Sequence, residues 1–218
     1  MKNRKQGHSF LVAAAIAVLG LLAPFCLLAD ESEAPVQVVE RISAELYQLL
    51  AGDRAQRPLE PESLYRGVDE VISPHVDYDR VARLVLGKYW RRSSPDQRQR
   101  FIAEFRQLLV RSYATAFSDF GDWEIRYLPS RRSQDGKRAV VRAKVTRPGA
   151  DPVEVAYAMH SREGRWLAYD VKVDGISLIT NYRNSFSKEI RRIGVDGLIR
   201  KLAAMNGRQR GADHLAAN

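Results

Sequence analysis

The sequence predicts an α+β fold, in which helices precede and follow a four-stranded antiparallel sheet. Apolar residues recur at helical spacing before residue 118 and after residue 177, whereas they alternate with polar residues between 123 and 173. Asp135-Gly136, Pro148-Gly149 and Glu163-Gly164 lie in the short loops between the alternating runs. Such loops are typical of consecutive hairpins, and the order helices, strands, helices is typical of the α+β class.

Helices are expected before the sheet over residues 35–51, 64–73, 79–86 and 95–117. Gly52, Pro74 and Gly87 end the first three, and Asp77 or Asp79 caps the third. Ser94 is the predicted N-cap of the fourth helix, with Gln97 three residues later as in a capping box.

The predicted strands carry one apolar face and one mostly polar face. We expect the apolar face to meet helices and the other to face water. The apolar positions are Trp123, Ile125, Tyr127; Ala139, Val141, Ala143, Val145; Val153, Val155, Tyr157, Met159; and Leu167, Tyr169, Val171, Val173.

Two helical stretches, 177–192 and 195–205, are expected after the sheet. Gly175 lets the chain turn from the last strand into the first of them. Residues 207–218 are rich in Gly, Ala and charge, and they predict a flexible tail.

The N-terminus has the pattern of a secretory signal peptide. Lys2, Arg4 and Lys5 precede an apolar run that ends near Ala29, so we predict cleavage after residue 29 and a single domain over 30–206. An uncleaved membrane anchor is the alternative, because the run is long enough to span a bilayer. Cleavage removes the single cysteine, Cys26, and lowers the formal net charge from +9 to +6 by removing those three basic residues.

No motif for metal, phosphate or nucleophilic chemistry is present in the sequence. The histidines that follow the signal peptide, His75, His160 and His214, are not at metal-ligand spacing. Asp77 and Asp79 are interpreted as helix caps in a solvated turn; the alternative is a general base at the mouth of a cone-shaped fold. Basic residues cluster at the predicted hairpin tip (Arg131, Arg132, Lys137, Arg138) and around residues 88–100, where they either are solvated or contact anionic headgroups or an acidic partner.

The apolar face of the sheet has two interpretations. It forms a filled core, or its small side chains leave a cavity for an apolar ligand. Pattern alone does not separate them, because a core face and a pocket wall carry the same residues.

Three segments taken together resemble the MlaC or toluene-tolerance auxiliary family. They are "VDYDRVARLVLGKYWRRSSPDQRQRFIAEFRQLLVRSYA" (76–114), "YDVKVDGISLITNYRNSF" (169–186) and "IGVDGLIRKL" (193–202), in the family's order and spacing. The resemblance covers most of residues 36–205, although the middle strands match in pattern more than in residues.

The resemblance implies a sheet of the NTF2/cystatin-like type, clasped by N- and C-terminal helices around an apolar pocket. It implies a periplasmic phospholipid carrier of the Mla pathway, which maintains outer-membrane lipid asymmetry, and not an enzyme. A monomer is the default expectation, and nucleic acid is not an expected partner of an exported protein that lacks an interleaved aromatic–basic motif. Its partners would be an inner-membrane ABC transporter complex with an MCE-type subunit and an outer-membrane lipoprotein–porin complex. Cofactors and metals are not expected, and phospholipid is the cargo.

The family's pocket location and the face assignment together predict the lipid-binding residues. They are Leu84, Val85, Phe105, Leu109, Tyr113, Val141, Val155, Tyr157, Val171, Val173, Ile176 and Ile179, with Arg91 and Arg183 near the headgroup at the mouth. The remaining hypotheses are a cone-fold enzyme that uses Asp77 or Asp79 and a protein-interaction module with a filled core.

Overall fold

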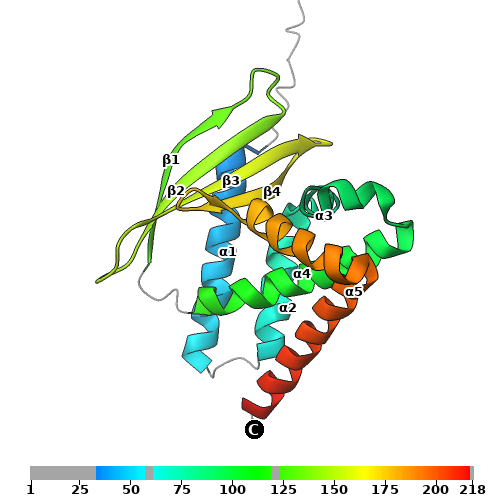
Figure 1. Cartoon of the computed structure of the whole chain (residues 1–218). Helices are drawn as coiled ribbons and strands as arrows, with labels where there is room; N and C mark the ends of the chain where they lie inside the picture. Colours follow the sequence, from blue (N-terminus) through cyan, green and yellow to red (C-terminus); the bar gives the residue numbers. More distant parts are fainter. Residues whose placement is uncertain (1–32, 57–60, 119–122, 217–218) are drawn as a thin grey trace, which may run out of the picture. The chain divides into compact units, whose positions relative to one another are not determined.

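The computed structural model describes residues 33–56, 61–118 and 123–216, so the predicted signal peptide lies outside the described part. Helices and strands follow the predicted order (Figure 1). Before the sheet come α1 (Pro35–Gln56), α2 (Pro61–Ile72), the 3₁₀ turn η1 (Ser73–His75), α3 (Tyr78–Leu86), the 3₁₀ turn η2 (Gly87–Arg92) and α4 (Pro95–Ser118). The sheet and α5 (Leu178–Ala216) complete the chain.

Local capping signals set the predicted helix boundaries. Asp77 is the N-cap of α3, and its side chain accepts a hydrogen bond from the amide of Arg80 at 2.9 Å. Ser94 and Gln97 form the predicted capping box of α4: each side chain accepts from the other residue's amide, at 2.9 and 3.1 Å. Gly87 ends α3 at φ 54°, a conformation that glycine adopts without strain.

The sheet has five antiparallel strands in sequence order, one more than predicted. They are β1 (Glu124–Arg132), β2 (Arg138–Thr146), β3 (Val153–Arg162), β4 (Arg165–Val173) and β5 (Ile176–Ser177). The extra strand arises at Asp174 and Gly175, whose φ angles of 47° and 81° form a two-residue hairpin turn. The chain therefore pairs back on β4 at Ile176 before α5 begins.

The C-terminal helical region bends at Gly194. This residue has φ 71° and ψ 175°, which divides α5 where the sequence predicts two helices. Beyond the bend the helix continues to Ala216, through most of the stretch in which the sequence predicts a flexible tail.

Buried apolar residues form three clusters. The first joins α3, α4 and α5 and includes Phe101, Phe105 and Leu202. The second joins α1, α2 and α4 through residues such as Leu46, Val68 and Val110. The third joins the start of α1 to the sheet and includes Val38, Val39, Ala139, Val141, Met159 and Trp166.

Both faces of the sheet contact helices, which corrects the expectation of one covered and one hydrated face. α1 packs on the face that carries Val141, whereas α3 contacts the opposite face near β4. There His160 bonds to Asp77, and Arg80 lies over the ring of Tyr169. Among the described helices, none is long and apolar enough to cross a membrane.

Candidate functional site

The apolar face of the sheet, here called the inner face, is the first component of the candidate site. Strand pairing aligns its side chains in rows across β2, β3 and β4. Val141 lies opposite Tyr157, which lies opposite Val171, and the next row is Ala143, Val155 and Val173. Val145 and Val153 form a further pair toward the β2–β3 turn. The predicted alternation is therefore confirmed for β2, β3 and the second half of β4. It is wrong for the first half of β4, because a register shift after Ala158 pairs Ala168 with Met159 on the inner face and turns Leu167 and Tyr169 to the opposite face.

Helix α1 covers only one end of the inner face. Its residues Val38 and Val39 pack on Ala139, Val141 and Met159, which are all buried. Toward the other end, Val155 and Val171 are only half-buried, Val173 is 37% exposed and Ile176 is 66% exposed. At this end the β4–β5 side of the inner face is therefore open, whereas Ala143 and Val145 on β2 are buried.

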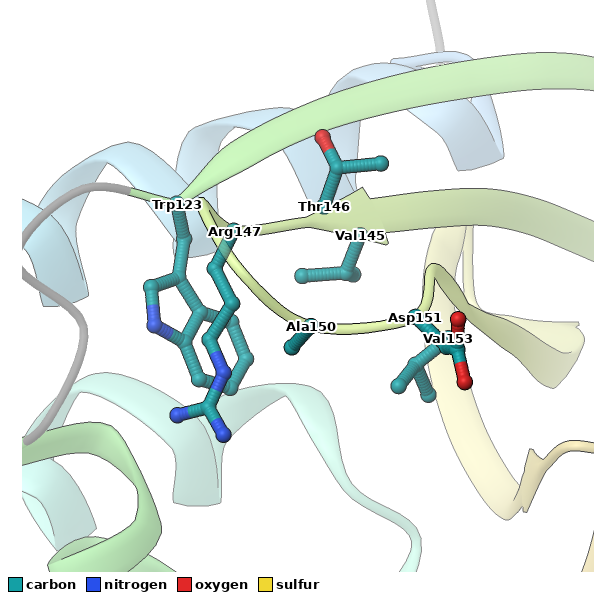
Figure 2. A pocket seen from close by; sticks show the side chains of 7 residues that line it. All are labelled: Trp123, Val145, Thr146, Arg147, Ala150, Asp151 and Val153. Carbon is teal, nitrogen blue, oxygen red and sulfur yellow. The ribbon is translucent and has the colours of Figure 1, made fainter.

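A cavity of about 270 Å³ lies at the same end of the sheet, beside Val145 and Val153. Figure 2 shows the side chains that line it, from the start of β1, the end of β2 and the turn into β3. Val145 and Val153 supply apolar wall from the inner face itself. The complete lining is Trp123, Val145, Thr146, Arg147, Ala150, Asp151 and Val153.

The cavity combines an apolar wall with charged groups. The guanidinium carbon of Arg147 lies 5.7 Å from the centre of the Trp123 ring, and Figure 2 shows the two side chains next to each other. Arg147 and Asp151 are exposed. A ligand with an apolar part and an anionic part would find partners for both here, because arginine binds phosphate and carboxylate oxygens.

Tyrosines occur both on the inner face, at Tyr157, and on the helices, at Tyr113 and Tyr182. Burial raises the pKa of Tyr157 to about 12. Burial also raises the pKa of Tyr182 on α5, and a side-chain hydrogen bond with Tyr113 on α4 contributes to this rise. These phenols therefore stay neutral at physiological pH, and they add apolar ring surface with a hydroxyl at the end.

The predicted lipid-binding residues divide into a buried and an open group. Val85, Phe105, Val141 and Ile179 are buried in packed clusters, and the half-buried Leu84 and Leu109 pack against the α3–α4–α5 cluster. Tyr113, Val155, Tyr157, Val171, Val173 and Ile176 are half-buried or exposed.

The structure separates Phe105 and Val141, which the sequence analysis placed around one pocket. Phe105 of α4 packs against α3 and α5, with its ring 5.0 Å from that of Tyr182, whereas Val141 packs against α1. Periodicity identified the apolar stripe of each helix, but it carried no signal for which partner each stripe meets.

The predicted mouth residues lie on different elements. Arg183 is half-buried on α5 and donates from Nε to the carbonyl of Leu84 at 2.6 Å, which ties α5 to the end of α3. Arg91 is exposed on η2. Neither lines the cavity beside Trp123.

The two candidate acids, Asp77 and Asp79, have different surroundings. Asp79 is exposed in the first turn of α3, whereas Asp77 is 8% exposed, so the predicted solvated turn is wrong for Asp77. Its Oδ1 accepts from the amide of Arg80 and its Oδ2 lies 2.9 Å from His160 Nε2. Neither carboxylate lines the cavity. Over the described ranges, no three His, Cys, Asp or Glu side chains form a group that could hold a metal ion.

The predicted lipid-binding residues did not include those that line the cavity. Trp123, Val145 and Val153 belong to the alternation that defines the inner face, so their orientation was available from the sequence. Arg147, Ala150 and Asp151 lie around the Pro148-Gly149 turn, where side-chain direction follows no simple period.

Comparison with known proteins gives consistent matches. Residues 40–204 match the model of a family described as MlaC protein. The toluene tolerance protein ttg2D of Pseudomonas putida is 31% identical over 180 residues, covering 82% of this chain and 83% of that protein. The intermembrane phospholipid transport system binding protein MlaC of Haemophilus influenzae is 21% identical over 171 residues, covering 77% and 80%.

A solved structure with the same fold contains a ligand. It is the phospholipid-binding protein from Ralstonia solanacearum in complex with a phospholipid, which is 29% identical in sequence. The TM-score is 0.72, and the match covers 79% of this chain and 97% of that chain.

Proposed function

Because the chain belongs to the MlaC protein family, we propose that it is a periplasmic carrier that binds a phospholipid and moves it between membranes. The observation that carries this proposal is the partly uncovered inner face, which leads from a packed core to a cavity with Arg147 at its rim. The Ralstonia solanacearum protein, solved with a phospholipid, supports the same ligand class.

A carrier needs apolar surface more than it needs reactive groups. Burying one methylene contributes about 0.8 kcal/mol, and a two-chain lipid has on the order of 25 methylenes, so transfer to water costs roughly 20 kcal/mol. Shielding the tails from water removes most of that barrier. The half-buried Val155, Tyr157 and Val171 offer such surface, with Tyr157 neutral because of its raised pKa.

Within this proposal the predicted residues have two roles. The acyl chains contact the open group, Tyr113, Val155, Tyr157, Val171, Val173 and Ile176, together with Val145 and Val153 of the cavity. Val85, Phe105, Val141 and Ile179 are supports, because packed neighbours already surround them. Arg147 replaces Arg91 and Arg183 as the proposed headgroup contact.

The proposal extends to export and partners. Residues 1–29 would direct secretion and be removed, and residues 30–206 would form one lipid-binding domain followed by a tail. The carrier would receive and deliver phospholipid at an inner-membrane ABC transporter complex with an MCE-type subunit and at an outer-membrane lipoprotein–porin complex.

The test is the lipid content of the protein purified from its host without detergent. Solvent extraction and mass spectrometry should find phospholipid in stoichiometric amount. Val171→Glu places a charge on the inner face and should abolish loading. Lys172→Glu is the matched control, because the next residue of the strand points to the opposite face and is exposed.

Absence of phospholipid from the wild-type protein would contradict the proposal. Equal loading of the two folded variants would contradict the face assignment.

A further inference from the structure

The face of the sheet opposite the inner face, here called the outer face, carries mainly cations on β1, β2 and the end of β4. Strand alternation and pairing place the following basic residues on it: Arg126, Arg131, Arg138, Arg142, Lys144 and Lys172. Arg126, Arg131, Arg138 and Lys172 are exposed, and Arg142 and Lys144 are half-buried.

Two of these cations are direct cross-strand partners. Arg126 on β1 lies opposite Lys144 on β2, and among the described residues no carboxylate forms an ion pair with either. Like charges that face each other on neighbouring strands destabilise a sheet. The fold alone gains nothing from this arrangement, so it points to a function outside the fold.

Carboxylates on the outer face do not balance this charge. Glu154 pairs with Arg142 at 2.8 Å. Asp170 accepts from the Ser177 hydroxyl at 2.7 Å and from the amide of Ile179 at 3.2 Å, so it is held at the start of α5. Glu124 is the first residue of β1 and lies opposite Thr146. The surface between these acids stays positive.

The outer face is open around the cations of β1 and β2, whereas the start of α5 lies beside Asp170 on β4. α3 contacts only the part near β4, through the bond between Asp77 and His160. Elsewhere the small side chains of Ala156 and Ala158 lie among the basic residues. Val140, which pairs with Arg131 and Ala158 on the same face, is 38% exposed. A partner can therefore approach the strands closely.

We propose that the outer face is a docking surface for an acidic protein. Paired strands hold the cations at fixed spacing, which suits carboxylates on a folded partner, whereas a fluid membrane requires no such spacing. The Arg142–Glu154 pair supports this choice, because a negative group within the patch repels a continuous anionic surface but can set the register of a protein partner. The surface is separate from the lipid site, since the strands turn their inner-face residues away from it.

The experiment first identifies the partner and then measures the interface. A photoreactive amino acid replaces Val140 in cells, with the same replacement of the exposed Tyr47 on α1 as control, and mass spectrometry identifies proteins cross-linked only from position 140. The identified protein is purified, and its affinity is measured for the wild type and for two double variants. The test variant carries Arg126→Glu and Lys144→Glu, and the control variant carries Arg66→Glu and Lys188→Glu. The last pair changes net charge equally at exposed helix positions away from the outer face.

We expect Arg126→Glu with Lys144→Glu to weaken the affinity for the partner at least about tenfold, and the control pair to change it little. Replacing acidic residues of the partner by lysine should restore the affinity of the first variant. Equal weakening by both pairs would overturn the inference, as would cross-linking to no protein. The inference would also be overturned if Arg126→Glu with Lys144→Glu weakened binding to phosphatidylglycerol vesicles but left the affinity for the protein partner unchanged. The lipid content of the same preparations reports separately on the proposed carrier function, because these substitutions leave the inner face intact.

Discussion

His160 on β3 lies 2.9 Å from the carboxylate of Asp77, the N-cap of α3. Both side chains are nearly buried, and the ring of Tyr169 contacts His160 edge-on at 5.8 Å. The other carboxylate oxygen of Asp77 caps the helix through the amide of Arg80. One aspartate therefore ends a turn, starts a helix and attaches that helix to the sheet.

Replacing His160 by Phe should lower the free energy of unfolding by roughly 1–3 kcal/mol, because the ring packing is kept while a buried carboxylate oxygen loses its partner. Asp77→Ala should cost more, since the loss of the helix cap adds about 1 kcal/mol. Urea unfolding measures both values.

Asp79→Asn is the control for these variants. This carboxylate is exposed two residues later, so its loss should change stability by less than about 0.5 kcal/mol. Equal effects of Asp79→Asn and Asp77→Ala would show that neither the helix cap nor the His160 contact contributes to stability.

Asp69 should make the stability depend on acid pH. Burial alone would raise the pKa of this carboxyl, but hydrogen bonds from Arg106 and Ser73 and the charge of Arg106 outweigh it and hold the pKa below 3.8. A lowered folded-state pKa stabilises the fold above the unfolded-state value, and this contribution is lost as the pH falls through the folded-state pKa.

In urea unfolding between pH 7 and 2, the wild type should therefore lose this contribution below about pH 4. Asp69→Asn should cost about 1 kcal/mol at pH 7, since the pair is partly exposed. It should also remove this part of the acid dependence. Parallel curves for the two proteins at every pH would contradict the assignment.

Gly194 should not tolerate a side chain. Its φ of 71° with ψ of 175° lies in a region occupied almost only by glycine, so Gly194→Ala should lower the melting temperature and cost about 1–3 kcal/mol. Gly207→Ala is the matched substitution in the same element: nothing lies within 4 Å of an added Cβ and no positive φ opposes it. That variant should be neutral or stabilised by up to about 1 kcal/mol. Similar melting temperatures for the two variants would contradict the strain at Gly194.

Ala150→Trp should reduce phospholipid loading, because the indole would occupy much of the 270 Å³ cavity. Extractable lipid phosphate per protein, measured with melting temperature, checks this prediction. Gln134→Trp adds the same ring at the exposed β1–β2 turn and should leave loading unchanged. A normal lipid content in a folded Ala150→Trp protein would place the ligand elsewhere on the inner face.

Most helix and strand boundaries were predictable, because their signals lie within a few residues of one another. The capping box of Ser94 and Gln97 and the cap of Asp77 each act over three residues. β5 was missed because Asp174-Gly175 was interpreted as a break before a helix, although both residues adopt the positive φ of a hairpin turn.

The sequence by itself determined which side chains share a face, because alternation in a strand is a local property of the extended backbone. Val141, Tyr157 and Val171 were placed on one side of the sheet in this way, and strand pairing confirms it. Only the tertiary structure decided that α1, and not α4, covers Val141, and that Val173 and Ile176 stay exposed. That choice depends on the packing of segments far apart in the chain, whose apolar stripes are alike in composition and differ only in the surface they meet.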